Sequence, residues 1–268
     1  MKDFLRQLLN GVQNQLLGRC LTREYLQARL LQSFQEQGTF NSWVFQGGTA
    51  LRFLYSMPRF SEDLDFALAK PGMKDDFREN LLNAKKTFEA EDYALNIKVN
   101  DTKTVKSAFV GFRGLLFELG LSAHGSETIS IKVEIDTNPP SGANFKTTVV
   151  RRHVTLNLRH HDKASLLAGK LHAVLARRYV KGRDIYDLVW YLSDRNWPEP
   201  NIELLNNALN QTNWEGSEVT TDNWRSLLRK RVESLKWDRV VEDVQPFLEH
   251  QEDIDLLTKQ NLLELLRR

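Results

Sequence analysis

The chain has 268 residues, 41 % of them apolar, which is enough for one large domain or two small ones with a buried core. It contains no apolar run near the roughly 18 residues that a membrane-spanning helix needs. Its N-terminal segment MKDFLRQLLNGVQNQLLG carries charges and amides where a signal peptide is apolar. These features predict a cytoplasmic protein without a membrane partner. The single cysteine, Cys20, excludes an internal disulfide and a cysteine-based zinc site.

The net charge of +2 is unevenly distributed along the chain. Between Arg151 and Arg183, nine lysines or arginines stand against one acid, so this segment carries +8. Because each phosphate that a basic side chain neutralises also releases counterions, such a segment suits a polyanion. A solvated charged surface is the alternative interpretation. A second basic cluster, residues 225–231, could extend the same track.

Apolar periodicity predicts the order of the secondary-structure elements. Two helices are expected at the N-terminus, over 4–16 and 26–34, with Thr22 as N-cap of the second. A short helix over 49–56 and a charged helix over 73–88 follow, and every periodic segment from residue 163 onward is helical. Strand-like segments cover 43–45, 64–69, 95–99, 108–119, 129–136 and 147–158. The sequence predicts an α+β protein with a mixed sheet core over 1–160 and a helical domain over 161–268.

Two aspartates separated by one leucine, Asp63 and Asp65, lie at the start of a predicted strand. Residues i and i+2 of a strand point to the same side, so the two carboxylates project together while Leu64 points into the core. Two carboxylates a few ångströms apart repel each other unless a cation lies between them. Mg²⁺ prefers hard oxygen ligands, often one or two carboxylates with substrate phosphates, so this pair predicts a metal site.

A glycine turn precedes the aspartates by about one short helix. Gly47 and Gly48 lack a Cβ, so their backbone can approach a phosphate closely, and the helix that begins near Thr49 offers free N–H groups. The Thr49 hydroxyl can cap that helix or bind a phosphate oxygen. Pro58 ends the helix, which lets the chain return and place the aspartates opposite the turn. Alone, a Gly-Gly-Thr sequence is more often only a turn.

Together, the GGT sequence at 47–49 and the DLD sequence at 63–65 resemble the signature of the nucleotidyltransferase superfamily related to DNA polymerase beta. The resemblance implies a third carboxylate from a later strand. In the segment KVEID, Glu134 is the favoured candidate because it lies in the middle of the strand, and Asp136 is the alternate. A solvated strand face is the structural alternative for both.

The predicted helix from residue 163 carries Lys170, Arg177 and Lys181 at helical spacing along the edge of an apolar stripe. Lys170 is therefore expected to be half-buried, with its charged head either reaching water or binding a triphosphate. Asp184 follows the turn at Gly182, where it can serve as the N-cap of the next helix.

Lys170, Arg177, Asp184 and Asp187 resemble the downstream motifs of the AbiEii family, which are nucleotidyltransferase toxins of type IV toxin–antitoxin and abortive-infection systems. With the earlier motifs, the resemblance covers about residues 40–195. It implies a nucleotidyltransferase core with a helical C-terminal half, use of an NTP with Mg²⁺, and addition of nucleotides to the 3′ end of tRNA. It also implies that Lys170 and Asp184 are essential and that a cognate antitoxin exists.

The sequence thus predicts a metal-dependent nucleotidyltransferase with an RNA acceptor. Two Mg²⁺ ions, or Mn²⁺ in their place, are expected on the carboxylates, and residues 151–183 are expected to hold the RNA. The predicted metal ligands are Asp63, Asp65 and Glu134, with Asp136 as alternate. The predicted nucleotide-binding residues are Gly47, Gly48, Thr49, Lys170 and Arg177. The predicted catalytic residues are Asp63, Asp65, Glu134, Lys170 and Asp184.

Three other functions fit parts of the same pattern. A glycosyltransferase can use an Asp-x-Asp pair to hold a sugar nucleotide, although the glycine turn lies unusually close ahead of the aspartates for that class. A nucleotidyltransferase that makes an oligonucleotide signal would share every catalytic residue. A non-catalytic RNA-binding module would carry vestigial carboxylates.

Overall fold

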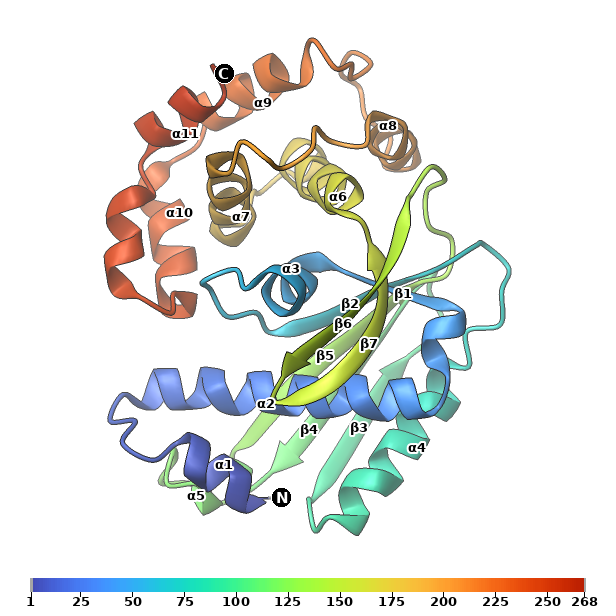
Figure 1. The fold of residues 1–268 in the computed structure, drawn as a ribbon, viewed down its shortest axis with the longest axis vertical. Helices are drawn as coiled ribbons and strands as arrows, with labels where there is room; N and C mark the ends of the chain where they lie inside the picture. Colours follow the sequence, from blue (N-terminus) through green and yellow to red (C-terminus); the bar gives the residue numbers. More distant parts are fainter. Residues whose placement is uncertain (1, 268) are drawn as a thin grey trace. The chain divides into compact units, whose positions relative to one another are not determined.

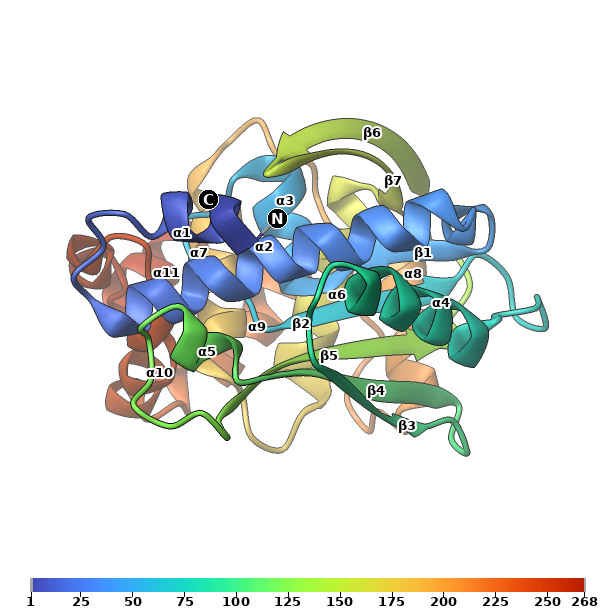
Figure 2. The same cartoon turned by 90° about the horizontal axis from the view of Figure 1, so that it is seen from below.

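The computed structural model describes residues 2–267 and divides into two compact units by its internal contacts. The first, here called the sheet unit, comprises the residues up to Leu54 with Phe60–Pro139 and Thr147–His160. The second, the helical unit, comprises Tyr55–Arg59, Pro140–Lys146 and the residues from His161 onward. Figures 1 and 2 show the elements of both units. In the part of the chain described, no helix is long and apolar enough to cross a membrane.

One mixed sheet of seven strands, in the order β3-β4-β5-β2-β1-β7-β6, forms the centre of the sheet unit. The strands are β1 (Trp43–Gln46), β2 (Asp63–Leu68), β3 (Leu95–Asn100), β4 (Val105–Arg113), β5 (Thr128–Asp136), β6 (Phe145–Arg152) and β7 (Val154–His161). Strand β2 pairs antiparallel with β1 and parallel with β5, while β4 pairs antiparallel with both β3 and β5. This arrangement confirms the predicted mixed sheet.

Helices cover one face of this sheet. The helices of this unit are α1 (Lys2–Leu8), α2 (Gln15–Glu36), α3 (Gly47–Tyr55), α4 (Phe77–Ala90) and α5 (Leu115–Glu118), with a 3₁₀ turn over Thr39–Asn41. Helix α2 runs across the sheet beside α4 (Figure 2), and the two contact β5 and β3 respectively. Buried aromatic rings fill the space between the helices and the sheet. The ring centroids of Trp43 and Phe66, for example, lie 5.0 Å apart. This packing explains the alternation of buried residues along the strands.

The N-terminal helices differ from their predicted bounds. The first ends at Leu8, and the chain passes through Gly11, whose φ of 81° requires glycine, before α2 begins at Gln15. Asn14 is the N-cap of α2, because its side chain accepts hydrogen bonds from the Leu16 and Leu17 N–H groups. The predicted N-cap Thr22 is wrong: it is buried within α2 and donates its hydroxyl to the Gly18 carbonyl oxygen.

Two predicted strands are interrupted by residues with positive φ. The predicted strand over 108–119 ends at Arg113, since Gly114 at φ 73° turns the chain into α5. The predicted strand over 147–158 is a hairpin of β6 and β7, which turns at His153 with φ 62°. Apolar alternation continues through both turns, so the pattern alone does not reveal them.

The helical unit confirms the prediction that all periodic segments after residue 163 are helical. Its α-helices are α6 (Lys163–Ala176), α7 (Gly182–Ser193), α8 (Ile202–Gln211), α9 (Trp224–Glu233), α10 (Trp237–Val244) and α11 (Lys259–Leu265). Short 3₁₀ turns cover Gln245–Phe247 and Gln251–Leu256. Helix α7 packs on α6, α10 and α11 (Figure 1). A Cβ on Gly182 would collide with the Val240 carbonyl group, so the close α7–α10 contact requires this glycine.

Candidate active site

Two carboxylates stand at the start of β2, in the middle of the sheet. Asp63 and Asp65 are partly exposed, whereas Leu64 and Phe66 between and after them are buried. The parallel pairing with β5 places Asp65 beside Glu134. Asp136 lies beside Ala67, two residues further along the strands. The register therefore favours Glu134 over Asp136 as the third carboxylate, because Glu134 is the direct cross-strand neighbour of Asp65.

The Asp136 carboxyl is also partly removed from water. Removal of its carboxyl from water raises its pKa above the ordinary value, and a hydrogen bond from the Asn138 N–H only partly offsets this effect. Asp136 is thus the less favourable candidate for the third carboxylate because of its place in the strand register.

The glycine turn lies directly against Asp65. Strand β1 pairs Gln46 with Asp65, and the chain then enters α3 through Gly47 at φ 79°. A Cβ at Gly47 would lie 2.9 Å from the Asp65 Cβ and Cγ atoms, and still closer to one carboxylate oxygen. The position therefore requires glycine for its conformation and for its space. The two sequence motifs meet here, and the backbone that begins α3 is adjacent to a candidate metal ligand.

Thr49 has a different role from the predicted one. Helix α3 begins at Gly47, so Thr49 lies in its first turn, and its side chain is fully buried. The hydroxyl donates a hydrogen bond to the Asp63 carbonyl oxygen. Neither the predicted N-cap nor a phosphate contact by the hydroxyl agrees with this geometry. Thr49 instead ties the start of α3 to β2, while the first-turn N–H groups of α3 have no partner within the helix.

The side chains near the aspartate pair determine whether a divalent cation fits there. Among residues 2–267, no three His, Cys, Asp or Glu side chains converge closely enough to hold a metal ion. The Glu134 carboxylate forms an ion pair of 2.8 Å with Lys132 on the same strand. Asp63 and Asp65 fit Mg²⁺ as a two-carboxylate site of the kind that leaves room for water and phosphate ligands. Glu134, the cross-strand neighbour of Asp65, is held by Lys132 through one of its two carboxylate oxygens.

A second group of candidate residues lies within the helical unit. Lys170, on α6, places its Nζ 3.0 Å from an Asp184 oxygen and 2.7 Å from an Asp187 oxygen. Arg177 Nη1 lies 2.6 Å from the other Asp184 oxygen. Burial disfavours the charge on Lys170, but the carboxylates of Asp187 and Asp184 outweigh it and raise the lysine pKa. Two acids of the same chain thus hold the charged head of Lys170.

Asp184 is charged despite its burial. Desolvation alone would raise the pKa of this carboxyl, but Lys170 and Arg177 together lower it below the ordinary value. Helix α7 begins at Gly182, with Lys181 at the cap position, so Asp184 is not the N-cap. Its carboxylate instead links two cations from α6 and the following segment.

Arg177 and Lys181 do not continue the α6 helix. The helix ends at Ala176, and Arg177 has an extended backbone with φ −74° and ψ 135°. The predicted helical spacing from Lys170 to Lys181 is therefore wrong beyond Ala176. This early end is what allows the Arg177 guanidinium to turn toward Asp184 on the next helix.

Sequence reasoning missed Arg59. Its Nε and Nη2 atoms each lie 2.6 Å from an oxygen of Asp187, and both side chains are almost fully buried. The Asp187 carboxylate thus receives Arg59 on one side and Lys170 on the other. The only sequence signal was the place of Arg59 in the loop between Pro58 and the aspartate pair. The resulting network alternates three cations with two carboxylates.

The basic segment 151–183 contributes residues to both units. It is divided between the two units, since the boundary falls after His160. Several of its cations already have protein partners, such as Arg152 with Glu24 and Lys163 with the Trp197 ring. The second basic cluster, residues 225–231, also has protein partners. Arg231 donates hydrogen bonds to the carbonyl oxygens of residues 174, 177 and 178. Charge counting alone therefore does not locate an RNA site.

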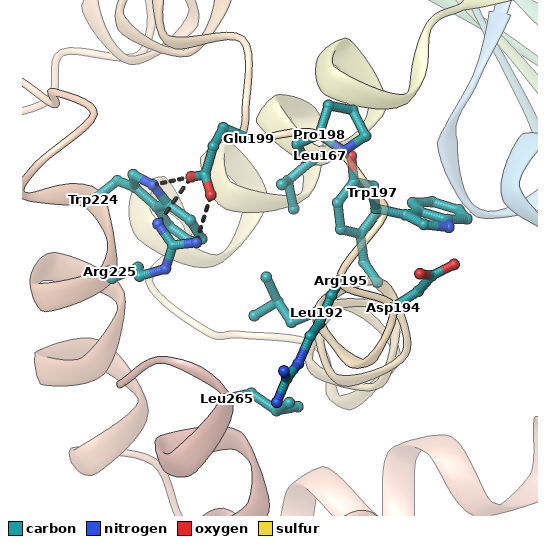
Figure 3. Close-up of a pocket in the computed structure, with 11 residues that line it drawn as sticks. Leu167, Leu192, Asp194, Arg195, Trp197, Pro198, Glu199, Trp224, Arg225 and Leu265 are labelled. Atoms are coloured by element: carbon teal, nitrogen blue, oxygen red, sulfur yellow. Dashed lines mark hydrogen bonds and ion pairs between the residues drawn. The ribbon is translucent and has the colours of Figure 1, made fainter. Parts of the chain in front are cut away.

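A cavity of about 350 Å³ in the helical unit is separate from these residues. Trp197 and Trp224 line it, and Glu199 accepts hydrogen bonds from the Trp224 indole and the Arg225 guanidinium along one wall (Figure 3). None of the candidate catalytic or nucleotide-binding residues is among those that line it. This cavity is not the candidate active site.

Known proteins share the family and the fold of this chain. Residues 29–265 match a family model described as nucleotidyl transferase AbiEii toxin of type IV toxin–antitoxin systems. The fold is similar to a putative nucleotidyltransferase from Helicobacter pylori, with 20 % identity, a TM-score of 0.57 and coverage of 92 % of this chain and 93 % of that one. It is also similar to MenT4, a nucleotidyltransferase toxin from Mycobacterium tuberculosis, with 19 % identity, a TM-score of 0.52 and coverage of 100 % and 99 %. No curated protein matches the chain.

Proposed function

Because this chain belongs to the AbiEii family of nucleotidyltransferase toxins, we propose that it transfers a nucleoside monophosphate from an NTP to the 3′ end of an RNA, with tRNA as the acceptor. The observation that carries the proposal is the contact between the Gly47 backbone and the Asp65 side chain. A phosphate bound to the turn would lie beside a carboxylate able to hold its counterion.

In this proposal the sheet unit binds the reacting phosphate. The first-turn N–H groups of α3, entered through Gly47 and Gly48, donate to the triphosphate, with the positive end of the helix dipole behind them. Asp63 and Asp65 would hold Mg²⁺, joined by Glu134 once it leaves Lys132. When bound, Mg²⁺ neutralises phosphate charge and favours ionisation of the acceptor hydroxyl. Thr49 acts as a positioning residue, since it ties the helix start to the Asp63 backbone.

The network of the helical unit supplies positive charge. Lys170 and Arg177 are proposed to bind phosphate oxygens of the NTP, which favours departure of pyrophosphate. Asp184 and Asp187 are proposed to orient these cations, and Arg59 holds the Asp187 carboxylate in place. With three cations and two carboxylates, the network keeps a net charge of +1, which suits an anionic ligand.

Addition of a nucleotide to the tRNA 3′ end would prevent aminoacylation and so block translation. The family belongs to a type IV toxin–antitoxin system, and we propose that a cognate antitoxin opposes this effect. A loss of the transfer reaction should therefore remove the toxicity of the protein in cells.

The test is transfer of labelled nucleotide by the purified protein. Wild type and Asp65→Asn are incubated with Mg²⁺, total tRNA and each labelled NTP in turn, and the products are separated on a denaturing gel. We expect label in the tRNA band with wild type only, and omission of Mg²⁺ should abolish it.

Other outcomes would identify another function. Label in short oligomers formed without tRNA would indicate synthesis of an oligonucleotide signal. Consumption of a UDP-sugar with no NTP transfer would indicate a glycosyltransferase. Binding of tRNA with no transfer, unchanged by Asp65→Asn, would indicate a non-catalytic RNA-binding module.

A further inference from the structure

One face of the sheet, on the opposite side from α2 and α4, carries polar and partly exposed residues. Along β5 every second side chain, at positions 129, 131, 133 and 135, is buried, and the residues between them are not. The same alternation exposes Lys98 on β3. We call the unburied side the open face. It includes Asp63 and Asp65, so it is the side on which the candidate metal site lies.

A row of four residues crosses the open face. Lys98 on β3 pairs with Phe109 on β4, and Phe109 pairs with Lys132 on β5. Lys132 in turn pairs with Asp63 on β2. Since neighbouring strands lie about 4.8 Å apart, Phe109 is about 10 Å from Asp63 along this row. An aromatic ring between two lysines therefore stands two strands away from a candidate metal ligand.

Phe109 is unusual among the phenylalanines of this sheet. Its side chain is 48 % exposed, whereas Phe66 on β2 and Phe112 on β4 are buried. Its neighbours along the same face of β4 are Ser107 and Gly111, which are too small to cover the ring. A single exposed phenylalanine needs no explanation by itself. Its place between two lysines in register with Asp63 is what suggests a ligand, because this combination binds single-stranded nucleic acid.

The in-line geometry of phosphoryl transfer indicates which ligand binds beside Phe109. Strand β2 has β1 on one side and β5 on the other, and Gly47 follows β1. If the triphosphate binds the glycine turn, the leaving pyrophosphate lies on the β1 side of the aspartates. The attacking and leaving oxygens of phosphoryl transfer are roughly in line, so the attacking hydroxyl enters from the β5 side. The surface formed by β5, β4 and β3 is then the side of the acceptor.

We propose that the row formed by Lys98, Phe109 and Lys132 binds the 3′-terminal nucleotides of the acceptor RNA. Phe109 stacks on a base, and the two lysines bind the adjacent phosphates. This inference rests on the proposed transferase function and gives its acceptor a binding surface in the sheet unit. A phosphate that binds Lys132 would also compete with Glu134 for this lysine, which releases Glu134 toward the metal.

The test separates RNA binding from nucleotide binding. Steady-state transfer is measured for wild type, Phe109→Ala and Phe109→Trp, with total tRNA and NTP varied separately, and tRNA affinity is measured by filter binding without NTP. Phe117→Ala is the matched control, because Phe117 is 54 % exposed but lies on α5, away from the row. Phe109→Ala should weaken tRNA binding and raise the KM for tRNA about 5- to 140-fold, the range expected for loss of one stacked base.

The KM for NTP should not change in Phe109→Ala. Phe109→Trp should bind tRNA with nearly wild-type affinity, and Phe117→Ala should behave as wild type in both assays. Lys98→Gln should lower the slope of log K against log salt by about 0.7, as expected for one lost phosphate contact. A rise only in the KM for NTP, or equal effects of Phe109→Ala and Phe117→Ala, would overturn the proposal. If wild type binds tRNA through Phe109 but transfers nothing, the surface stands and the proposed function fails.

Discussion

The contact between Gly47 and Asp65 can be tested by adding a single methyl group. Gly47→Ala places a side chain at φ 79°, which costs about 1–2 kcal/mol for an L-residue. The new Cβ also lies 2.9 Å from two Asp65 atoms and closer to a third, so the carboxylate must move. Overpacking of this kind costs about 1–3 kcal/mol, which gives a total loss of about 2–5 kcal/mol in the free energy of unfolding.

Gly72→Ala is the matched control. Gly72 has φ 81°, and a Cβ there would have no heavy atom within 4 Å, so this variant has the backbone strain without the collision. Its expected loss is only about 1–2 kcal/mol. Denaturant unfolding of both variants measures the difference, which isolates the contact between Gly47 and Asp65.

Activity provides the second readout. Displacement of a candidate ligand by about 1 Å can lower a rate by about 100-fold, so Gly47→Ala should lose most tRNA labelling while Gly72→Ala keeps it. Equal stability losses in the two variants, together with full activity of Gly47→Ala, would refute the claim that the glycine turn and Asp65 form one site.

Three further predictions concern other parts of the structure. Glu134→Ala should reduce tRNA labelling by at least about 100-fold and Asp136→Ala by only a few-fold; the reverse order would reassign the third carboxylate. Arg59→Met should lower stability by about 3–5 kcal/mol in denaturant unfolding because it leaves Asp187 under-compensated, and the double change with Asp187→Leu should recover part of the loss. Glu24 has its pKa lowered from 4.5 to about 2, since His153, Arg52 and Arg152 outweigh the effect of burial. A carboxyl with a lowered pKa stabilises the folded state above about pH 4.5. The free energy of unfolding of wild type should therefore exceed that of Glu24→Gln by about 3 kcal/mol above this pH, and the difference should shrink as the pH falls from 4.5 to 2. A difference that does not change with pH would contradict this prediction.

The sequence alone determined the type and order of most elements and the family. Apolar periodicity and alternation are local properties, so they predicted the sheet, the helical second half and the short helix between Gly47 and Pro58. The aspartate pair could be recognised because its i, i+2 spacing has a direct meaning in a strand. The N-cap of α2 and the turn between β6 and β7 were not predicted correctly, because a positive φ at Gly11 or His153 leaves the apolar pattern unchanged.

Only the tertiary structure decided which of these residues meet. Strand pairing placed Glu134, rather than Asp136, beside Asp65, and it aligned Phe109 with Lys132 across strands that are distant in sequence. Packing buried the Thr49 hydroxyl, and it joined Arg59 to a carboxylate 128 residues away. Spacing along the chain carries no information about register between strands or about ion pairs between distant segments, since both arise only when the chain packs.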